Sequence, residues 1–282
     1  MPSRALPLAT PSRSTHFPLL LLVLAGLSAC GRDNPKTPQS TPSAAAAPAG
    51  VATYSVEIVH RYPHDPTAFT EGLEWDDGTL YEGTGLVGQS SVRRTDLATG
   101  ALLAHAELPP PHFGEGITVF HGTLYELTWT EGIGFRYDPK TLTRHGQFTY
   151  TGEGWGLTHD DRSLIMSDGT NVLRYVDPQT FHVQRTLAVS ADGLPVPRLN
   201  ELERIHGEIW ANVWQSTQIA RIDPQSGHVI AWIDIAPLVP EHLSTDTVDV
   251  ANGIAYDSAA DRIFITGKLW PTLYQIRLGP RE

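Results

Sequence analysis

The sequence predicts an all-β fold, a five-bladed β-propeller in which the N-terminal strand completes the last blade. A hairpin motif recurs five times along the chain, at a period typical of propellers and other repeat architectures. Short runs rich in Val, Ile, Tyr, Trp and Thr alternate with turns rich in Asp, Gly and Pro. No segment of ten or more residues shows helical periodicity.

Each copy of the motif has an aliphatic anchor, a tight turn and a second aliphatic anchor. The two anchors are seven residues apart in four copies and nine apart in the fifth. The copies run from Glu71 to Gly85, Glu115 to Trp129, Trp155 to Gly169, Asn200 to Trp214, and Asn252 to Lys268.

Residues 1–29 carry arginines and then an apolar run from Phe17 to Leu27, which predicts a bacterial signal peptide. The run is too short to span a bilayer comfortably. Leu27-Ser28-Ala29-Cys30 resembles a lipobox, so Cys30 is expected to carry the lipid in a lipoprotein anchored in a membrane and facing the periplasm. A plain signal peptide with a chance cysteine is the alternative, and either version exports the domain.

The chain after the signal divides by composition. Residues 30–50 are rich in Pro, Ala and Ser and predict a flexible tether, whereas 51–282 can form a single all-β domain.

The formal net charge is −11 and no Lys/Arg run occurs, which argues against a nucleic-acid partner. A monomer is expected.

Four strands are expected in each repeat. After the hairpin, the third strands end in related segments, which are Phe135 to Pro139, Leu173 to Pro178 and Ile219 to Pro224. The last repeat stops after its third strand, Thr272 to Leu278. We expect Tyr54 to His60 to supply the missing outer strand and close the ring.

The register of the repeats predicts a site. Two residues before the first anchor stand Glu71, Glu115, Trp155, Asn200 and Asn252; five residues after the second anchor stand Gly85, Trp129, Gly169, Trp214 and Lys268. Because the two strands of a hairpin are antiparallel, both sets should meet at one mouth of the central channel. Polar groups that converge within aromatic walls are typical of a small-ligand site.

Other interpretations stay open for these residues. Backbone N–H groups could satisfy the carboxylate of Glu115, and the tryptophans could pack between blades. Lys268 could be a solvated charge. The assignments of Glu71 and Asn252 to the site are the weakest.

Several motifs together resemble the signature of the plant and bacterial glutaminyl-peptide cyclotransferases. They include Phe69-Thr70-Glu71-Gly72-Leu73, Phe113-Gly114-Glu115-Gly116, Gly152-Glu153-Gly154-Trp155, Ala211-Asn212-Val213-Trp214 and Thr266-Gly267-Lys268-Leu269-Trp270. The resemblance covers about 53 to 278 in the right order. It implies a five-bladed propeller that converts N-terminal glutamine into pyroglutamate and releases ammonia.

The resemblance also implies roles for individual residues. Glu115 would be the catalytic proton-transfer residue, and Asn200 and Lys268 would fix the substrate amide and stabilise its oxygen. The aromatic walls would be Trp129, Trp155 and Trp214, with flanking Phe69 and Phe113. Glu71 departs from the plant members, which carry Gln there, so substrate preference or pH optimum could differ.

No catalytic metal or cofactor is expected, although the animal glutaminyl cyclases, which have a different fold, use zinc. The nearest approach to metal-ligand spacing is His60, His64 and Asp65, for which a turn after the closing strand is the preferred interpretation. Whether a structural cation occupies the channel is left open. Gly83 to Gly88 fits a dinucleotide-binding pattern, but a strand follows instead of a helix.

Two other functions remain possible from the sequence. A lipid-anchored propeller could be a non-catalytic binding scaffold, since the fold alone proves no function. A lactonase-like enzyme would require a metal on the propeller axis. The preferred partners are peptides and proteins with N-terminal glutamine.

Overall fold

The computed structural model describes residues 50–241 and 250–281, all within the compact unit Ala47–Glu282. Residues 1–29 and Cys30 lie outside the described part. Strands make up nearly all of the regular structure, as the sequence predicts. Within these ranges the helical structure is the 3₁₀ turn η1 (Ala236–Leu238), and no helix is long and apolar enough to cross a membrane.

Three sheets each contain four consecutive antiparallel strands. The first contains β2 (Thr70–Asp76), β3 (Thr79–Thr84), β4 (Ser91–Thr95) and β5 (Leu102–Glu107). The second contains β6 (Gly114–Phe120), β7 (Thr123–Thr128), β8 (Ile133–Tyr137) and β9 (Arg144–Thr149). The third contains β10 (Leu157–His159), β11 (Leu164–Met166), β12 (Val172–Val176) and β13 (Val183–Ala188).

The remaining long strands form one eight-stranded sheet, in the order β16-β17-β18-β19-β1-β22-β21-β20. Its members are β16 (Leu199–Ile205), β17 (Glu208–Val213), β18 (Gln218–Ile222), β19 (Val229–Asp234), β1 (Thr53–Pro63), β20 (Ala251–Asp257), β21 (Arg262–Gly267) and β22 (Thr272–Arg281). A small hairpin, β14 (Ser190–Ala191) with β15 (Leu194–Pro195), stands apart.

The N-terminal strand β1 pairs antiparallel with β22 from Tyr54 to Pro63, which confirms the expected partner. Both strands are longer than expected. In addition, β1 pairs in parallel with β19 through Thr53 and Tyr54. This second pairing, which the sequence did not predict, joins two four-stranded groups into one sheet.

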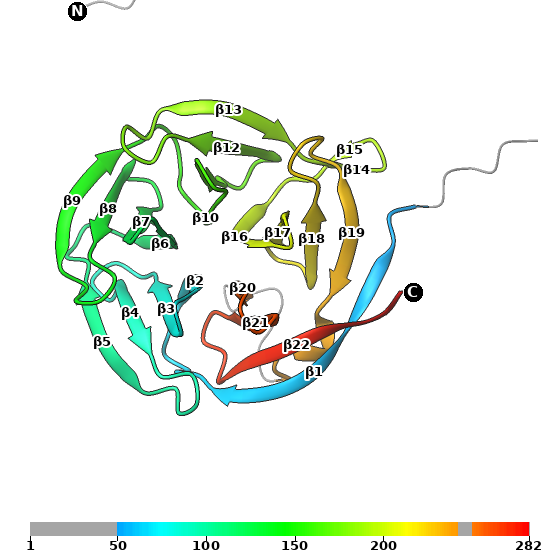
Figure 1. Cartoon of the computed structure of the whole chain (residues 1–282), viewed down its shortest axis with the longest axis horizontal. Helices are drawn as coiled ribbons and strands as arrows, with labels where there is room; N and C mark the ends of the chain where they lie inside the picture. The colour runs from blue at the N-terminus through cyan, green and yellow to red at the C-terminus, as the bar shows by residue number, and fades with distance from the viewer. Residues whose placement is uncertain (1–49, 242–249, 282) are drawn as a thin grey trace, which may run out of the picture. The chain divides into compact units, whose positions relative to one another are not determined.

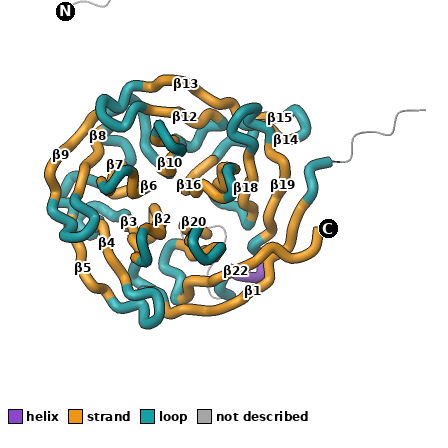
Figure 2. The backbone as a smooth tube through the Cα atoms, viewed as in Figure 1, coloured by secondary structure: helices purple, strands orange, loops and turns teal. Residues whose placement is uncertain are grey.

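The sheets follow one another round a common centre (Figure 1). Strands β2, β6, β10, β16 and β20 lie nearest that centre, and β5, β9, β13 and β19 lie at the periphery. β2 contacts both β6 and β20, so the chain's first inner strand meets its last. The backbone trace is strand and loop almost throughout (Figure 2).

Anchor residues of the hairpin motif fill the space between the sheets. The first anchors, Leu73, Ile117, Leu157, Leu202 and Ile254, are each at most 1% exposed. Burying a side chain of this size contributes about 1.5–3 kcal/mol. Every residue of β6 is buried, because an inner strand is covered on both faces.

Aspartates end the third strands and shape the turns to the outer strands. The Oδ1 atoms of Asp138, Asp177 and Asp223 each accept backbone N–H groups two and three residues ahead. These bonds satisfy the turn donors and lower the pKa of each carboxyl. The turns that the Asp-Pro pairs predict are therefore stabilised by hydrogen bonds to the aspartate side chains.

Candidate active site

One pocket of about 320 Å³ gathers seven of the ten residues that the repeat register selected. It is lined by Phe69, Glu71, Leu86, Phe113, Glu115, Trp129, Trp155, Asn200, Trp214 and Lys268. The start of each inner strand lies beside the end of the second strand of its hairpin, as the antiparallel register requires. Asn252 does not line this pocket.

β-Bulges turn the polar side chains at the start of the inner strands. The register shifts between Thr70 and Gly72, which brackets Glu71, and between Gly114 and Ile117, which brackets Glu115. Equivalent shifts occur at Leu199/Leu202 and Ala251/Ile254. Bulges re-aim side chains and are common next to active sites. The same irregularity therefore turns the polar residue at the start of β2, β6, β16 and β20, whereas β10, which follows Trp155, pairs with β11 without a shift.

Two glycines of the register leave room for aromatic rings. A Cβ at Gly85 would lie 2.4 Å from the Phe113 ring, and a Cβ at Gly169 would lie 2.7 Å from the Trp155 indole. The backbone of Gly169 also has φ +76°. The absence of a side chain at these two positions is therefore part of the pocket.

Lys268 and Glu71 form a buried ion pair. Nζ of Lys268 lies 2.6 Å from Oε1 of Glu71 and 4.5 Å from the centroid of the Phe69 ring. Lys268 is only 7% exposed, so it is not a solvated surface charge. Asn252, which is fully buried, donates from Nδ2 to Oε2 of Glu71 at 2.9 Å. Asn252 thus supports the pocket from behind.

The carboxyl of Glu115 faces that of Glu71. Burial, followed by the negative charge of Glu71, raises the pKa of Glu115 well above its ordinary value. Burial also raises the pKa of Glu71, against the opposing effect of the Lys268 charge. Both carboxyls therefore favour the protonated form more than an exposed carboxyl does. The pair can hold one proton between its two carboxyls.

The tryptophans form the walls of the pocket. Trp129 is 42% exposed, so it does not serve as a core residue, and its ring lies 5.7 Å from that of Phe113. Trp155 and Trp214 meet edge to face at 5.6 Å. Trp129 and Trp155 both donate their indole N–H to the same oxygen, Oε2 of Glu153, at 2.8 Å.

Asn200 completes the polar lining. It is 3% exposed, and its Oδ1 has no hydrogen-bond partner among the described residues. Buried amide oxygens normally accept a hydrogen bond. Asn200 therefore has an unused acceptor at the pocket.

Sequence reasoning missed two residues near the pocket, Leu86 and Glu153. Leu86 lies inside the glycine-rich segment that resembles a nucleotide motif, and it has φ 81°. Glu153 lies in a loop outside the repeated hairpin, so the register assigned no role to it. Its sequence signal was its place in the segment Gly152-Glu153-Gly154-Trp155, which carries part of the family resemblance but gave Glu153 no role.

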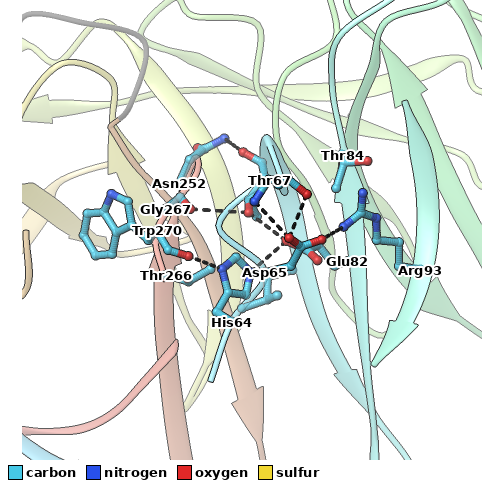
Figure 3. Close-up of polar contacts among 12 residues, drawn as sticks. His64, Asp65, Thr67, Glu82, Thr84, Arg93, Asn252, Thr266, Gly267 and Trp270 are labelled. Carbon is cyan, nitrogen blue, oxygen red and sulfur yellow. Dashed lines mark hydrogen bonds and ion pairs between the residues drawn. The ribbon is translucent and has the colours of Figure 1, made fainter. Parts of the chain in front are cut away.

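The three residues nearest to metal-ligand spacing do not come together: His60 lies within β1, whereas His64 and Asp65 follow the strand and join a network of polar contacts (Figure 3). Nε2 of His64 lies 2.9 Å from Oε1 of Glu82, and Nδ1 lies 2.6 Å from the Trp270 carbonyl oxygen. Asp65 pairs with Arg93 instead. Within residues 50–241 and 250–281, no group of three His, Cys, Asp or Glu side chains could hold a metal ion.

The His64 network reaches the pocket through Thr70. Its Oγ1 donates to Oε1 of Glu82 at 2.7 Å, and its carbonyl oxygen accepts from Nδ2 of Asn252 at 3.0 Å. Since Asn252 also donates to Glu71, the buried polar groups are continuous from His64 to the ion pair. Figure 3 shows the part of this network between His64 and Asn252.

Fold and site together define an all-β protein with an enzyme-like small-ligand pocket of paired carboxyls, an ammonium group and indole walls at its centre. The model of the glutamine cyclotransferase family matches residues 33–278. The chain therefore belongs to the glutamine cyclotransferase family, in agreement with the resemblance seen in the sequence.

Known proteins agree with this assignment. The chain is 45% identical over 227 residues to the glutaminyl-peptide cyclotransferase of Arabidopsis thaliana, covering 79% of this chain and 71% of that protein. The crystal structure of the Myxococcus xanthus glutaminyl cyclase superposes with a TM-score of 0.76 at 36% identity. That match covers 81% of this chain and 98% of the other.

Proposed function

We propose that this protein is a glutaminyl-peptide cyclotransferase, which converts the N-terminal glutamine of peptides and proteins to pyroglutamate and releases ammonia. The family and both relatives support this assignment. In the reaction, the α-amine nitrogen bonds to the side-chain amide carbon and the bond from that carbon to the amide nitrogen breaks. One proton passes from the α-nitrogen to the departing ammonia.

The observation that carries the mechanism is the carboxyl of Glu115, buried in the pocket against that of Glu71. The reaction needs a group that first accepts a proton from the attacking amine and then returns it to the leaving nitrogen. A carboxyl with a raised pKa suits both steps, because general acid–base catalysis works best when the pKa lies near the working pH. Glu115 is the proposed catalytic residue, and Glu71 tunes it.

The remaining lining residues bind and orient the substrate. Glutamine has a flexible side chain that must fold back so that its carbonyl meets its own amine, and rigid indole walls favour this near-attack geometry. We assign to Asn200 and Lys268, which both line the pocket, the roles of fixing the substrate amide and stabilising the charge that develops on its oxygen. Phe69 and Phe113 close the pocket beside Lys268 and Trp129, respectively.

We propose that the reaction uses no metal or other cofactor. The chemistry requires only proton transfer and stabilisation of charge, and the pocket residues carry groups for both. Activity should therefore survive dialysis against a chelator.

The direct experiment follows ammonia release from a Gln-initiated dipeptide, with wild type and Glu115→Gln compared as folded proteins. The variant keeps the shape of the side chain but cannot accept the proton, so we expect kcat to fall at least about 100-fold. A Glu115→Gln protein that retained most of its activity would contradict the role of Glu115. No ammonia release from folded wild type would favour a binding scaffold, and chelator-sensitive activity on sugar lactones would favour a lactonase.

We also propose that the ring is a five-bladed β-propeller. The parallel contact between β1 and β19 is only two residue pairs long, whereas β1 and β22 pair along most of their length. Dividing the eight-stranded sheet at the short contact leaves two further four-stranded units. Strand β1 then serves as the outer strand of the last blade.

For the chain before the described residues, we propose a lipoprotein leader and a tether that holds a monomeric enzyme at a periplasmic membrane surface. The lipobox-like segment ending at Cys30 supports this proposal. Labelled palmitate should be incorporated into wild type but not into Cys30→Ala, and the variant should move to the soluble fraction. Labelling of Cys30→Ala would contradict the anchor.

A further inference from the structure

Glu153 connects two walls of the pocket although it lies outside the repeated hairpin. Trp129 follows β7, and Trp155 precedes β10 in the next sheet. Their indole N–H groups converge on one oxygen, Oε2 of Glu153, each at 2.8 Å. One carboxylate oxygen therefore fixes the relative orientation of indoles from two sheets.

The loop that carries Glu153 is itself fixed. Arg174 donates to the carbonyl oxygens of Thr151 at 2.6 Å and Glu153 at 2.7 Å. The N–H of Gly154 donates to the carbonyl oxygen of Trp129 at 2.9 Å. Trp129 is therefore bound twice by this loop, at its carbonyl oxygen by a backbone N–H and at its indole N–H by the Glu153 side chain. The loop can act as a rigid support for the pocket wall.

Trp129 needs such a support, because 42% of its surface is exposed and an exposed side chain can change rotamer. The Phe113 ring packs edge to face against it. The hydrogen bond to Glu153 supplies a charge-assisted contact, which is stronger than one between neutral groups. Without that bond, the wall formed by Trp129 would lose its fixed orientation.

We propose that Glu153 is a positioning residue, which clamps Trp129 and Trp155 in the orientation that receives the glutaminyl substrate. The inference rests on the proposed cyclotransferase function for its consequence in the reaction, but the clamp itself can be tested without substrate. Glu153 acts through the indoles and is given no part in proton transfer.

The first test measures the clamp directly in ¹⁵N-tryptophan-labelled protein. The indole N–H signals of Trp129 and Trp155 are assigned from Trp129→Phe and Trp155→Phe. In Glu153→Ala we expect both signals to move upfield and to exchange faster with water, while the other indole signals stay in place. Glu153→Gln keeps an acceptor oxygen at the same reach, so it should largely restore both signals. Unchanged signals in Glu153→Ala would overturn the clamp.

The second test measures the reaction. The rigid walls favour the near-attack geometry of the substrate, so a loose wall in Glu153→Ala should lower kcat/KM about tenfold, with a fall in kcat contributing to the loss. Glu153→Gln should stay within about twofold of wild type in both constants. Glu131→Ala is the matched control, because this nearby carboxylate accepts from the Thr130 N–H and contacts no indole N–H.

The outcomes separate the two proposals. If the indole signals move in Glu153→Ala but kcat/KM does not change, the role of the clamp in positioning the substrate is overturned. If wild type shows no cyclase activity, the proposed function fails, and the indole signals still decide whether Glu153 holds the two rings.

Discussion

Nζ of Lys268 lies 2.6 Å from Oε1 of Glu71, although 197 residues separate them along the chain. Glu71 belongs to β2 and Lys268 follows β21, so the contact joins the first inner hairpin to the last. The pair also affects Glu115: burial and then the negative charge of Glu71 raise the pKa of Glu115, whereas the positive charge of Lys268 opposes that rise.

Replacing Glu71 by Gln should change the pH dependence of activity. The variant removes the negative charge beside Glu115 and leaves Lys268 without its counter-ion, and both changes favour the ionised form of Glu115. The pKa of Glu115 should therefore fall, and the acidic limb of kcat/KM for a Gln-peptide should move to lower pH. Measuring kcat/KM between about pH 5 and 9 tests this expectation.

Glu107→Gln is a suitable control for that profile, because the side chain of Glu107 is 83% exposed and lies on the outer strand β5. Its profile should match wild type. An acidic limb that does not move in Glu71→Gln would show that Glu71 does not tune Glu115.

Gly169→Ala should damage the site more than the fold. The added Cβ would lie 2.7 Å from the Trp155 indole, so the ring must move, and kcat/KM should fall about tenfold or more. The left-handed backbone adds a stability loss of about 1–2 kcal/mol. Activity assays with urea unfolding measure both effects.

Gly193→Ala is the control that separates the effect of backbone strain from that of contact with the Trp155 ring. Gly193 has φ +80°, close to that of Gly169, but nothing lies within 4 Å of its added Cβ. This variant should lose similar stability and keep its activity. Equal activity in the two variants would mean that the position of Trp155 does not depend on Gly169.

The repeat register made Glu115 and Trp129 predictable, because their positions relative to two buried anchors fix where an antiparallel hairpin presents them. The same register places Asn252 with them, but the structure shows it behind Glu71 instead of in the lining. Register fixes the position of a residue along a strand. It does not specify how a bulge turns the side chain.

Residues outside the repeat were not predictable in the same way. Glu153 acts through the spatial meeting of two loops, and no periodic pattern marks that meeting. The parallel contact of Thr53 with Trp232 likewise depends on how far the N-terminal strand extends in the folded ring. Tertiary contacts of this kind leave no local signal in composition or spacing.

Stability should fall as pH rises from about 4.5 to 8, and Glu126 is one identifiable cause. Burial raises its pKa from 4.5 to about 8, despite the hydrogen bond from the Tyr137 hydroxyl. Because its pKa is raised, Glu126 keeps a proton in the folded state that it releases in the unfolded state. The contribution of this proton to the free energy of unfolding is full below the unfolded pKa and is lost as pH rises through the folded pKa.

Glu126→Gln should therefore flatten the dependence of the free energy of unfolding on pH. The slope from one such group is about 1.4 kcal/mol per pH unit between its two pKa values. The variant should be more stable relative to wild type at pH 8 than at pH 5, as measured by urea unfolding. Glu107→Gln should leave the slope unchanged, and an equally steep slope in Glu126→Gln would exclude Glu126 as the source.

His64 should contribute stability in its protonated form. Burial alone would lower its pKa, but the charge and hydrogen bond of Glu82, with the Trp270 carbonyl, outweigh burial and raise it. For a base with a raised pKa, the stabilisation is fully present below the unfolded pKa of 6.5 and is lost as pH rises through the folded pKa. His64→Gln removes that titration while keeping a donor for Glu82.

The variant should be about 1–3 kcal/mol less stable than wild type near pH 6, because a neutral amide replaces the charged imidazolium that pairs with Glu82. The difference between the two proteins should shrink as pH rises through the folded pKa of His64. Taking this difference at each pH cancels the contribution of Glu126, which both proteins share. Urea unfolding at a series of pH values measures it, and a constant difference would show that His64 stabilises the fold without its charge.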